Sequence, residues 1–183
     1  MDEKALTQLK FPIGEFIKPE VISNDQIKEW VADIEAFPSR VKILTTNLSV
    51  EQLNWRYRPD GWTIKQVVHH CADSHMNSLI RFKLALTEDS PTIRPYHEER
   101  WAELIDSQDN DLSYTLSLLE GLHYRLVQLQ RNLSEEDLKR EFIHPEHGRR
   151  FTLAETIGIY AWHSNHHLAH IQQALGYQGK FLE

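Results

Sequence analysis

A stretch of eleven residues near the carboxyl end, residues 160–170, holds four of the chain's eleven histidines. It contains two pairs spaced four residues apart, His163 with His167 and His166 with His170. Residues at this spacing lie on the same face of an α-helix, one turn apart. The apolar residues around them also recur at helical spacing, which predicts a helix that packs one face against other helices. Two imidazoles held in this way can bind one transition metal ion.

The apolar stripe of this predicted helix indicates which pair faces the interior. His163 and His167 lie together on one flank of the stripe, and His170 and Tyr160 share that flank. His166 points away from the stripe. The pair that faces the bundle is therefore predicted to be His163 and His167. The stripe itself consists of Leu153, Ile157, Ser164, Leu168, Ile171 and Leu175.

A third ligand has to come from another segment, and the sequence offers a second group of histidines on another predicted helix. His69 and His70 lie on opposite flanks of that helix's apolar stripe, so the periodicity alone does not choose between them. Asp73 lies one turn after His70. It is a candidate catalytic residue that orients a ligand imidazole or handles a proton, and the alternative is a solvated surface charge.

The other histidines carry less information. His75, on the inner stripe, and His170 are predicted to be packing groups or supports for the ligands. Cys71 also lies on the inner stripe and is interpreted as a small apolar core residue rather than a nucleophile. Surface positions are predicted for His97, His123, His144 and His147.

The length of 183 residues suits one domain, residues 1–183, with a sizeable core. Residues 1–22 are predicted to be an irregular arm, because Pro12 and Pro19 interrupt any regular element there. Four amphipathic helices follow, which predicts an all-α fold, a four-helix bundle. They are expected from Ser23 to Leu48 with a kink or restart at Pro38, from Thr63 to about Leu86, from Leu112 to Leu129, and from Thr152 to Leu175 with Gly176 as the stop.

Two connections between these helices have features of their own. A short β-hairpin is predicted before the last helix, with residues 141–143 and 149–151 flanking a turn. The connection over residues 87–107 is long for a compact domain, and such loops are often functional. Its side chains Tyr96, His97 and Trp101 are predicted to form the wall of a pocket.

Several motifs, taken together, resemble the DinB/YfiT-like superfamily, and the YfiT branch most closely. They are Gly61-Trp62-Thr63, His70 with Asp73-Ser74-His75-Met76-Asn77, the run from Arg81 to Glu88, and Trp162-His163 with His167. The resemblance implies that the metal histidine of the second helix is the one eight residues after Trp62, which is His70 rather than His69. It implies that His163 and His167 are the other two ligands. It further implies a bundle of four long helices, one divalent ion (zinc or nickel), a homodimer and a cytoplasmic location.

Three functions fit these observations. The first is a metal-dependent hydrolase that uses a three-histidine site to activate water against a small molecule, since three protein ligands leave coordination positions open. The second is a metal-dependent thiol S-transferase that uses bacillithiol or a similar low-molecular-weight thiol, because bacillithiol S-transferases belong to the same branch. The third is a non-catalytic, metal-binding helical module. No residue in the sequence separates the first two.

Charge and sequence pattern disfavour nucleic-acid-binding, membrane-spanning and secreted proteins. A formal net charge of −7 disfavours nonspecific binding to nucleic acid or to anionic membranes. The single cysteine suits a reducing compartment. The amino-terminal residues lack the pattern of a signal peptide, and no apolar run approaches the roughly 20 residues of a membrane-spanning helix. These features also favour a cytoplasmic location.

Overall fold

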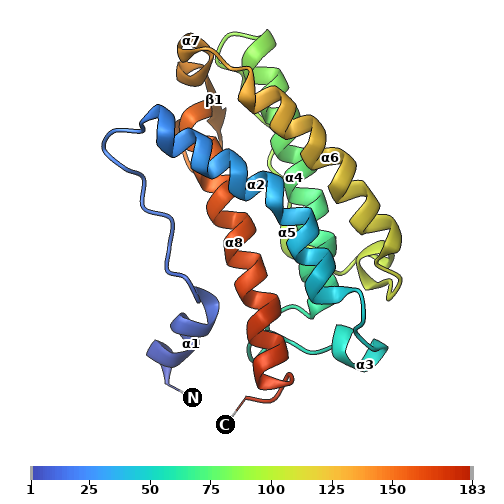
Figure 1. The fold of residues 1–183 in the computed structure, drawn as a ribbon. Helices are drawn as coiled ribbons and strands as arrows, with labels where there is room; N and C mark the ends of the chain where they lie inside the picture. Colours follow the sequence, from blue (N-terminus) through green and yellow to red (C-terminus); the bar gives the residue numbers. More distant parts are fainter. Residues whose placement is uncertain (1, 182–183) are drawn as a thin grey trace.

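Four long helices form the body of the computed structural model, which describes residues 2–181. Figure 1 shows α2 and α6 crossing in front of α4 and α8. α2 packs against both α6 and α8, and α4 packs against the same two helices, so the four close into a bundle. This confirms the predicted bundle. The long helices are α2 (Asn24–Thr45), α4 (Ile64–Thr87), α6 (Ser113–Arg131) and α8 (Leu153–Tyr177).

Shorter elements connect the long helices. The predicted hairpin is present, and its two strands pair antiparallel with Phe142 opposite Phe151. Its strands are β1 (Glu141–His144) and β2 (Arg149–Thr152), and the short helices are α1 (Glu3–Lys10), α3 (Val50–Leu53), α5 (Glu98–Trp101), the 3₁₀ helix η1 (Ile105–Gln108) and α7 (Glu135–Lys139).

Polar side chains fix the beginnings of three long helices at the predicted positions. The Ser23 hydroxyl accepts a hydrogen bond from the backbone N–H of Gln26 at the start of α2. Thr63 and Gln66 form a complete capping box at the start of α4. At the start of α8, the Thr152 hydroxyl accepts a hydrogen bond from the backbone N–H of Glu155. Each cap provides a partner for an N–H group that the first helical turn leaves free, which explains why helix starts are readable from sequence.

α2 continues through Pro38, so of the two outcomes predicted there, a kink or a restart, the restart is wrong; Phe37 and Val41, on either side of the proline, are both fully buried on one continuous face. The predicted stop of the last helix at Gly176 is also wrong. α8 continues past Gly176 and ends one residue later, where Gln178 adopts a left-handed conformation with φ 53°. Gly179 follows it, also with positive φ, and provides the reversal expected of a helix stop.

A buried polar layer divides the core in two. One apolar cluster, at the hairpin end, includes Leu79 and Ile157, and the other includes Val68 and Leu168. Between them along α4, His75 is only 1% exposed. His70 and His167 are buried nearby. Burial of several imidazoles in the middle of a bundle is costly unless their ring nitrogens find partners. Packing alone therefore does not explain this layer.

The amino-terminal arm contains a helix, which corrects the prediction that residues 1–22 are irregular. α1 forms because the Asp2 carboxylate accepts a hydrogen bond from the Ala5 N–H at 2.7 Å, and because both prolines lie beyond Lys10. The arm runs beside α8 (Figure 1), where the Trp162 indole donates to the carbonyl of Gly14 at 3.0 Å. The arm therefore covers the outer face of the histidine-rich helix.

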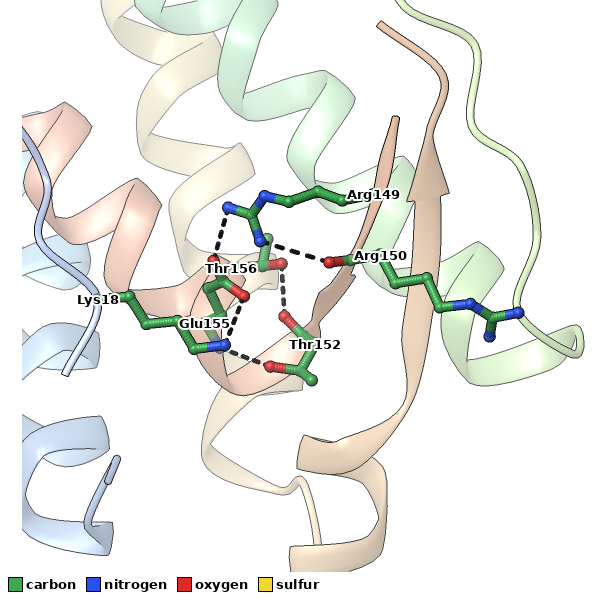
Figure 2. Close-up of polar contacts among 6 residues, drawn as sticks. All are labelled: Lys18, Arg149, Arg150, Thr152, Glu155 and Thr156. Atoms are coloured by element: carbon green, nitrogen blue, oxygen red, sulfur yellow. Dashed lines mark hydrogen bonds and ion pairs between the residues drawn. The ribbon is translucent and has the colours of Figure 1, made fainter. Parts of the chain in front are cut away.

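The hairpin and the arm meet at one buried carboxylate, Glu155, on the first turn of α8 (Figure 2). Glu155 is 1% exposed and accepts hydrogen bonds from Lys18 of the arm at 3.0 Å and from Arg149 of β2 at 2.8 Å. Burial alone would raise the pKa of Glu155, but these bonds outweigh burial and hold its pKa below the usual 4.5. The charged carboxylate therefore ties two peripheral segments to the bundle.

Glu155→Gln is expected to lower the free energy of unfolding by about 1–3 kcal/mol at pH 7. This is less than the cost of breaking a fully buried pair, because Lys18 and Arg149 are half exposed and can be hydrated. Since the pKa of Glu155 is lower in the folded chain, its contribution is present above about pH 4.5 and is lost as the pH falls below that value. Urea unfolding of the variant and the wild type at pH 7 measures the loss.

The matched control is Asp25→Asn, which removes an exposed carboxylate paired with Lys28 and should change stability little. A Glu155→Gln variant as stable as the wild type at pH 7 would contradict the assigned role.

None of the helices within residues 2–181 combines the length and the apolar character that crossing a membrane requires.

Candidate metal centre

Three histidines from two helices converge in the polar layer. α4 supplies His70, and α8 supplies His163 and His167 one turn apart. One ring nitrogen from each lies within 4.8 Å of the others. The Nε2 atoms of His70 and His163 are 3.3 Å apart, and the ring centroids of His70 and His167 are 4.9 Å apart. The structure therefore brings together the three residues that the sequence predicts as ligands.

Burial keeps these three imidazoles neutral. Burial, with a smaller effect of the nearby His166, lowers the pKa of His70 to about 4. Burial lowers the pKa of His163 and of His167 well below 6.5, and neighbouring histidines add to the shift. A neutral imidazole offers a lone pair, whereas a protonated one offers none. At pH 7 the three rings thus present a donor set that suits a divalent transition metal ion.

His69, which the sequence could not separate from His70, has a different environment. Its Nδ1 lies 2.8 Å from the Thr115 hydroxyl on α6, and its Nε2 lies 3.1 Å from the carbonyl oxygen of Asp109. Both ring nitrogens therefore have partners outside the three-histidine group. Of the two candidate ligands on α4, His70 is therefore the one that joins His163 and His167.

Two cavities border the three histidines. A cavity of about 520 Å³ is lined by all three, with Trp62 and residues of the amino-terminal arm at its wall. A second, of about 530 Å³, reaches His163 and is lined on the other sides by the hairpin and by Tyr96 and His97. The predicted pocket wall is therefore present in part. Trp101 does not line this cavity and packs its ring against Tyr96 instead, 4.5 Å away.

A family model described as the DinB superfamily matches residues 33–171. The chain belongs to the DinB superfamily. Two relatives carry the name "putative metal-dependent hydrolase". YfiT of Bacillus subtilis is 48% identical over 165 residues, covering 90% of this chain and 93% of the relative. A protein of Oceanobacillus iheyensis is 51% identical over 162 residues, covering 88% and 93%.

The fold of this DinB-superfamily chain also matches a solved structure. That structure is of YfiT from Bacillus subtilis, which is described as having an unusual four-helix bundle topology. The two agree with a TM-score of 0.91 at 46% identity, over 95% of this chain and 99% of the other. The predicted resemblance to the DinB/YfiT-like superfamily is confirmed.

Asp73, the candidate catalytic residue, is half buried on α4. Burial, with a smaller effect of Asp106, raises its pKa to about 6. It lines neither of the two cavities, and no hydrogen bond joins its carboxylate to an imidazole among the described residues. Glu98 is exposed overall but lines both cavities, where partial desolvation and the charge of the neighbouring Glu99 raise its pKa. Glu98 is therefore better placed than Asp73 to exchange a proton with a molecule beside the histidines.

His166 is buried in this DinB-type bundle, although it points away from the apolar stripe. Its ring stacks on Trp162 at 4.5 Å and lies 5.9 Å from Phe11 of the arm. The arm supplies the cover that helical periodicity could not predict. His166 forms a second group of converging ring nitrogens with His167 and His170, so two arrangements share His167.

Predicted surface positions for His97 and His147 are confirmed, but those for His123 and His144 were wrong, since these two are 1% and 8% exposed. The sequence carried a signal for each. His123 lies on the apolar stripe of α6, four residues after Leu119. His144 lies two residues after the buried Phe142, on the same face of β1. The predicted burial of Cys71 in the core is confirmed.

Sequence reasoning also missed a polar group at the cavity beside His163. The Tyr160 hydroxyl donates to the carbonyl oxygen of Ser74 at 3.3 Å and accepts from the Arg81 guanidinium at 3.3 Å. All three residues line the cavity. Ser74 and Arg81 are seven residues apart, which places them two turns apart on one face of α4.

Proposed function

We propose that this chain is a metal-dependent hydrolase that binds one divalent transition metal ion, zinc or nickel, through His70, His163 and His167, and that its substrate is a small molecule. The observation that carries the proposal is the convergence of three neutral imidazoles beside two cavities, with His70 and His167 buried and His163 partly buried. The names of the relatives support metal dependence and hydrolysis as the general class.

The donor set fits a catalytic ion better than a structural one. Structural zinc sites have four protein ligands, whereas three leave a position for water or substrate. When bound, such an ion lowers the pKa of a coordinated water toward neutrality and polarises a carbonyl or phosphoryl oxygen. The cavity that all three histidines line would admit a small molecule beside their ring nitrogens.

The chain's own residues would bind and orient the substrate. In the cavity beside His163, Arg81 and Tyr160 offer a guanidinium and a hydroxyl to polar groups of a ligand. Phe142 and Phe151 from the hairpin line the same cavity and offer apolar contact. A volume of about 530 Å³ suits a small molecule rather than a polymer. We infer that Glu98 serves as the proton carrier.

Thiol transfer remains the second candidate within the same site, because an ion that activates water also activates a thiol by lowering its pKa. A low-molecular-weight thiol such as bacillithiol would then be a co-substrate. A passive metal-binding module is the third. The two cavities favour both enzyme functions over it.

Elemental analysis and a substrate screen separate the three functions. Protein purified without chelator or affinity metal is expected to hold about one zinc or nickel ion per chain. The metal-loaded protein is then incubated with panels of small esters, amides and phosphoesters, with and without an added low-molecular-weight thiol. Turnover without thiol is the expected result. Turnover that requires the thiol would replace hydrolysis by transfer, and bound metal without any turnover would favour the passive module.

A further inference from the structure

Each of the two proposed metal ligands on α8, His163 and His167, contacts another histidine through Nδ1, the ring nitrogen that faces away from the proposed metal site. His163 Nδ1 lies 2.9 Å from His75 Nε2, and His167 Nδ1 lies 3.3 Å from His170 Nδ1. His75 and His170 are only 1% and 2% exposed. Neither contact is accounted for by metal binding, and each continues to a backbone carbonyl oxygen.

The first series of contacts begins at the carbonyl oxygen of Ile34 in α2, which can only accept a hydrogen bond. His123 Nδ1 lies 2.6 Å from that oxygen, so Nδ1 must carry the proton of this neutral ring and Nε2 must carry the lone pair. His123 Nε2 lies 2.7 Å from His75 Nδ1, which must therefore be the donor. His75 Nε2 then accepts from His163 Nδ1. The lone pair of His163 is left on Nε2, which faces His70.

The second series begins at the carbonyl oxygen of Lys10, the last residue of α1. His170 Nε2 lies 3.0 Å from this oxygen and must donate, which leaves a lone pair on His170 Nδ1. His167 Nδ1 then donates to it, and the lone pair of His167 is left on Nε2. The Tyr57 ring stacks on His170 at 3.7 Å and fixes its plane.

We propose that His75 with His123, and His170 on the other side, are positioning residues that hold His163 and His167 in the Nδ1–H tautomer, so that both present Nε2 to the metal. This rests on the proposed function for its purpose, but the tautomers themselves follow from two carbonyl groups. The ring nitrogen that carries the proton is set by the bond its other nitrogen makes. Ile34 and Lys10 thus determine protonation at a site that neither touches.

The same reasoning decides between the two groups of converging histidines. His167 and His170 are explained as donor and acceptor of one hydrogen bond, without an ion between them. The His166–His167–His170 group is therefore a support for His167 rather than a second metal site. It also gives the amino-terminal arm a role, because α1 supplies the carbonyl on which this support depends.

Nitrogen-15 NMR of the metal-free protein tests the tautomers without activity or metal. Long-range proton–nitrogen correlations at pH 7, on protein with labelled histidine, show which nitrogen of each ring is protonated. The expected result is Nδ1–H for His123, His75, His163 and His167, and Nε2–H for His170. Nε2–H at His163 or His167 would overturn the proposal.

Metal affinity tests the positioning role. His75→Phe, His123→Phe and His170→Phe are each expected to weaken Ni²⁺ binding by about 10–100-fold, the usual effect of losing a residue that orients a ligand. His69→Phe is the matched control: it is a buried histidine on α4, next to His70, with partners outside both series. The affinity of His69→Phe for Ni²⁺ should stay within a few-fold of that of the wild type.

The tautomer of His163 in these variants separates a positioning role from general damage to the fold. In His123→Phe, thermal unfolding should show a folded protein, and the His163 signal should change to a mixture of tautomers. A His163 ring that stays fully Nδ1–H in His123→Phe and His75→Phe would overturn the role of these residues. If wild-type protein shows the expected tautomers but binds no metal, the proposed function fails and the hydrogen-bond series stands.

Discussion

His167→Ala is expected to weaken binding of Ni²⁺ or Zn²⁺ by more than about 100-fold, a larger effect than the loss of a supporting residue. His167 is the only member that both groups of converging histidines share. Its imidazole is one of three protein ligands, and two are too few to hold the ion against water. Isothermal titration of metal-free protein with each ion measures the change.

Two further variants decide which group binds the ion. His70→Ala should lose metal as His167→Ala does, because His70 belongs only to the proposed site. His166→Ala should bind metal nearly as well as the wild type, because it belongs only to the second group and stacks on Trp162. The opposite pattern, with metal kept in His70→Ala and lost in His166→Ala, would show that the wrong group was chosen.

Acid is expected to unfold the metal-free protein well above the pH at which carboxylates titrate. Burial lowers the pKa of a set of histidines in the folded state, whereas in the unfolded chain they take up protons near 6.5. The folded state is therefore favoured fully above about pH 6.5 and loses stability as the pH falls toward 4. The set comprises His70, His75, His123, His144, His163, His166, His167 and His170.

For each pH unit below 6.5, each such histidine can lower the free energy of unfolding by up to about 1.4 kcal/mol. Together they can therefore offset the roughly 5–15 kcal/mol that stabilises an ordinary domain. The free energy of unfolding in urea, measured from pH 7.5 to pH 5, should fall steeply with the uptake of several protons. His97→Asn is the control, because His97 is exposed and does not belong to this set. A free energy of unfolding that is constant over this pH range would contradict the prediction that buried, neutral histidines make the folded protein sensitive to acid.

Local signals in the sequence were sufficient to predict the bundle and two of the three convergent histidines, His163 and His167. Thr63 and Thr152 place the starts of α4 and α8 because a cap is made within four residues of chain. The face of α8 that carries His163 and His167 follows from the fixed geometry of one helix. The choice of His70 over His69 needed more, since both flanks of α4 are buried, and the family resemblance supplied it.

Contacts between distant segments explain what the sequence did not predict. His123 contacts the carbonyl oxygen of Ile34, which is 89 residues away, so this partner depends on how α2 and α6 pack. The cover over His166 comes from Phe11 of the arm, at the other end of the chain. Asp73 was chosen for its position one turn after His70, but periodicity could not show that the cavities lie on another side of α4.

The most direct test of the three-histidine site is X-ray diffraction from crystals of the metal-loaded protein, with anomalous data collected on either side of the nickel or zinc absorption edge. One anomalous peak is expected, about 2.0–2.1 Å from the Nε2 atoms of His70, His163 and His167. A peak bound by His166 and His170 instead, or none in crystals of protein saturated with either ion, would contradict the central claim.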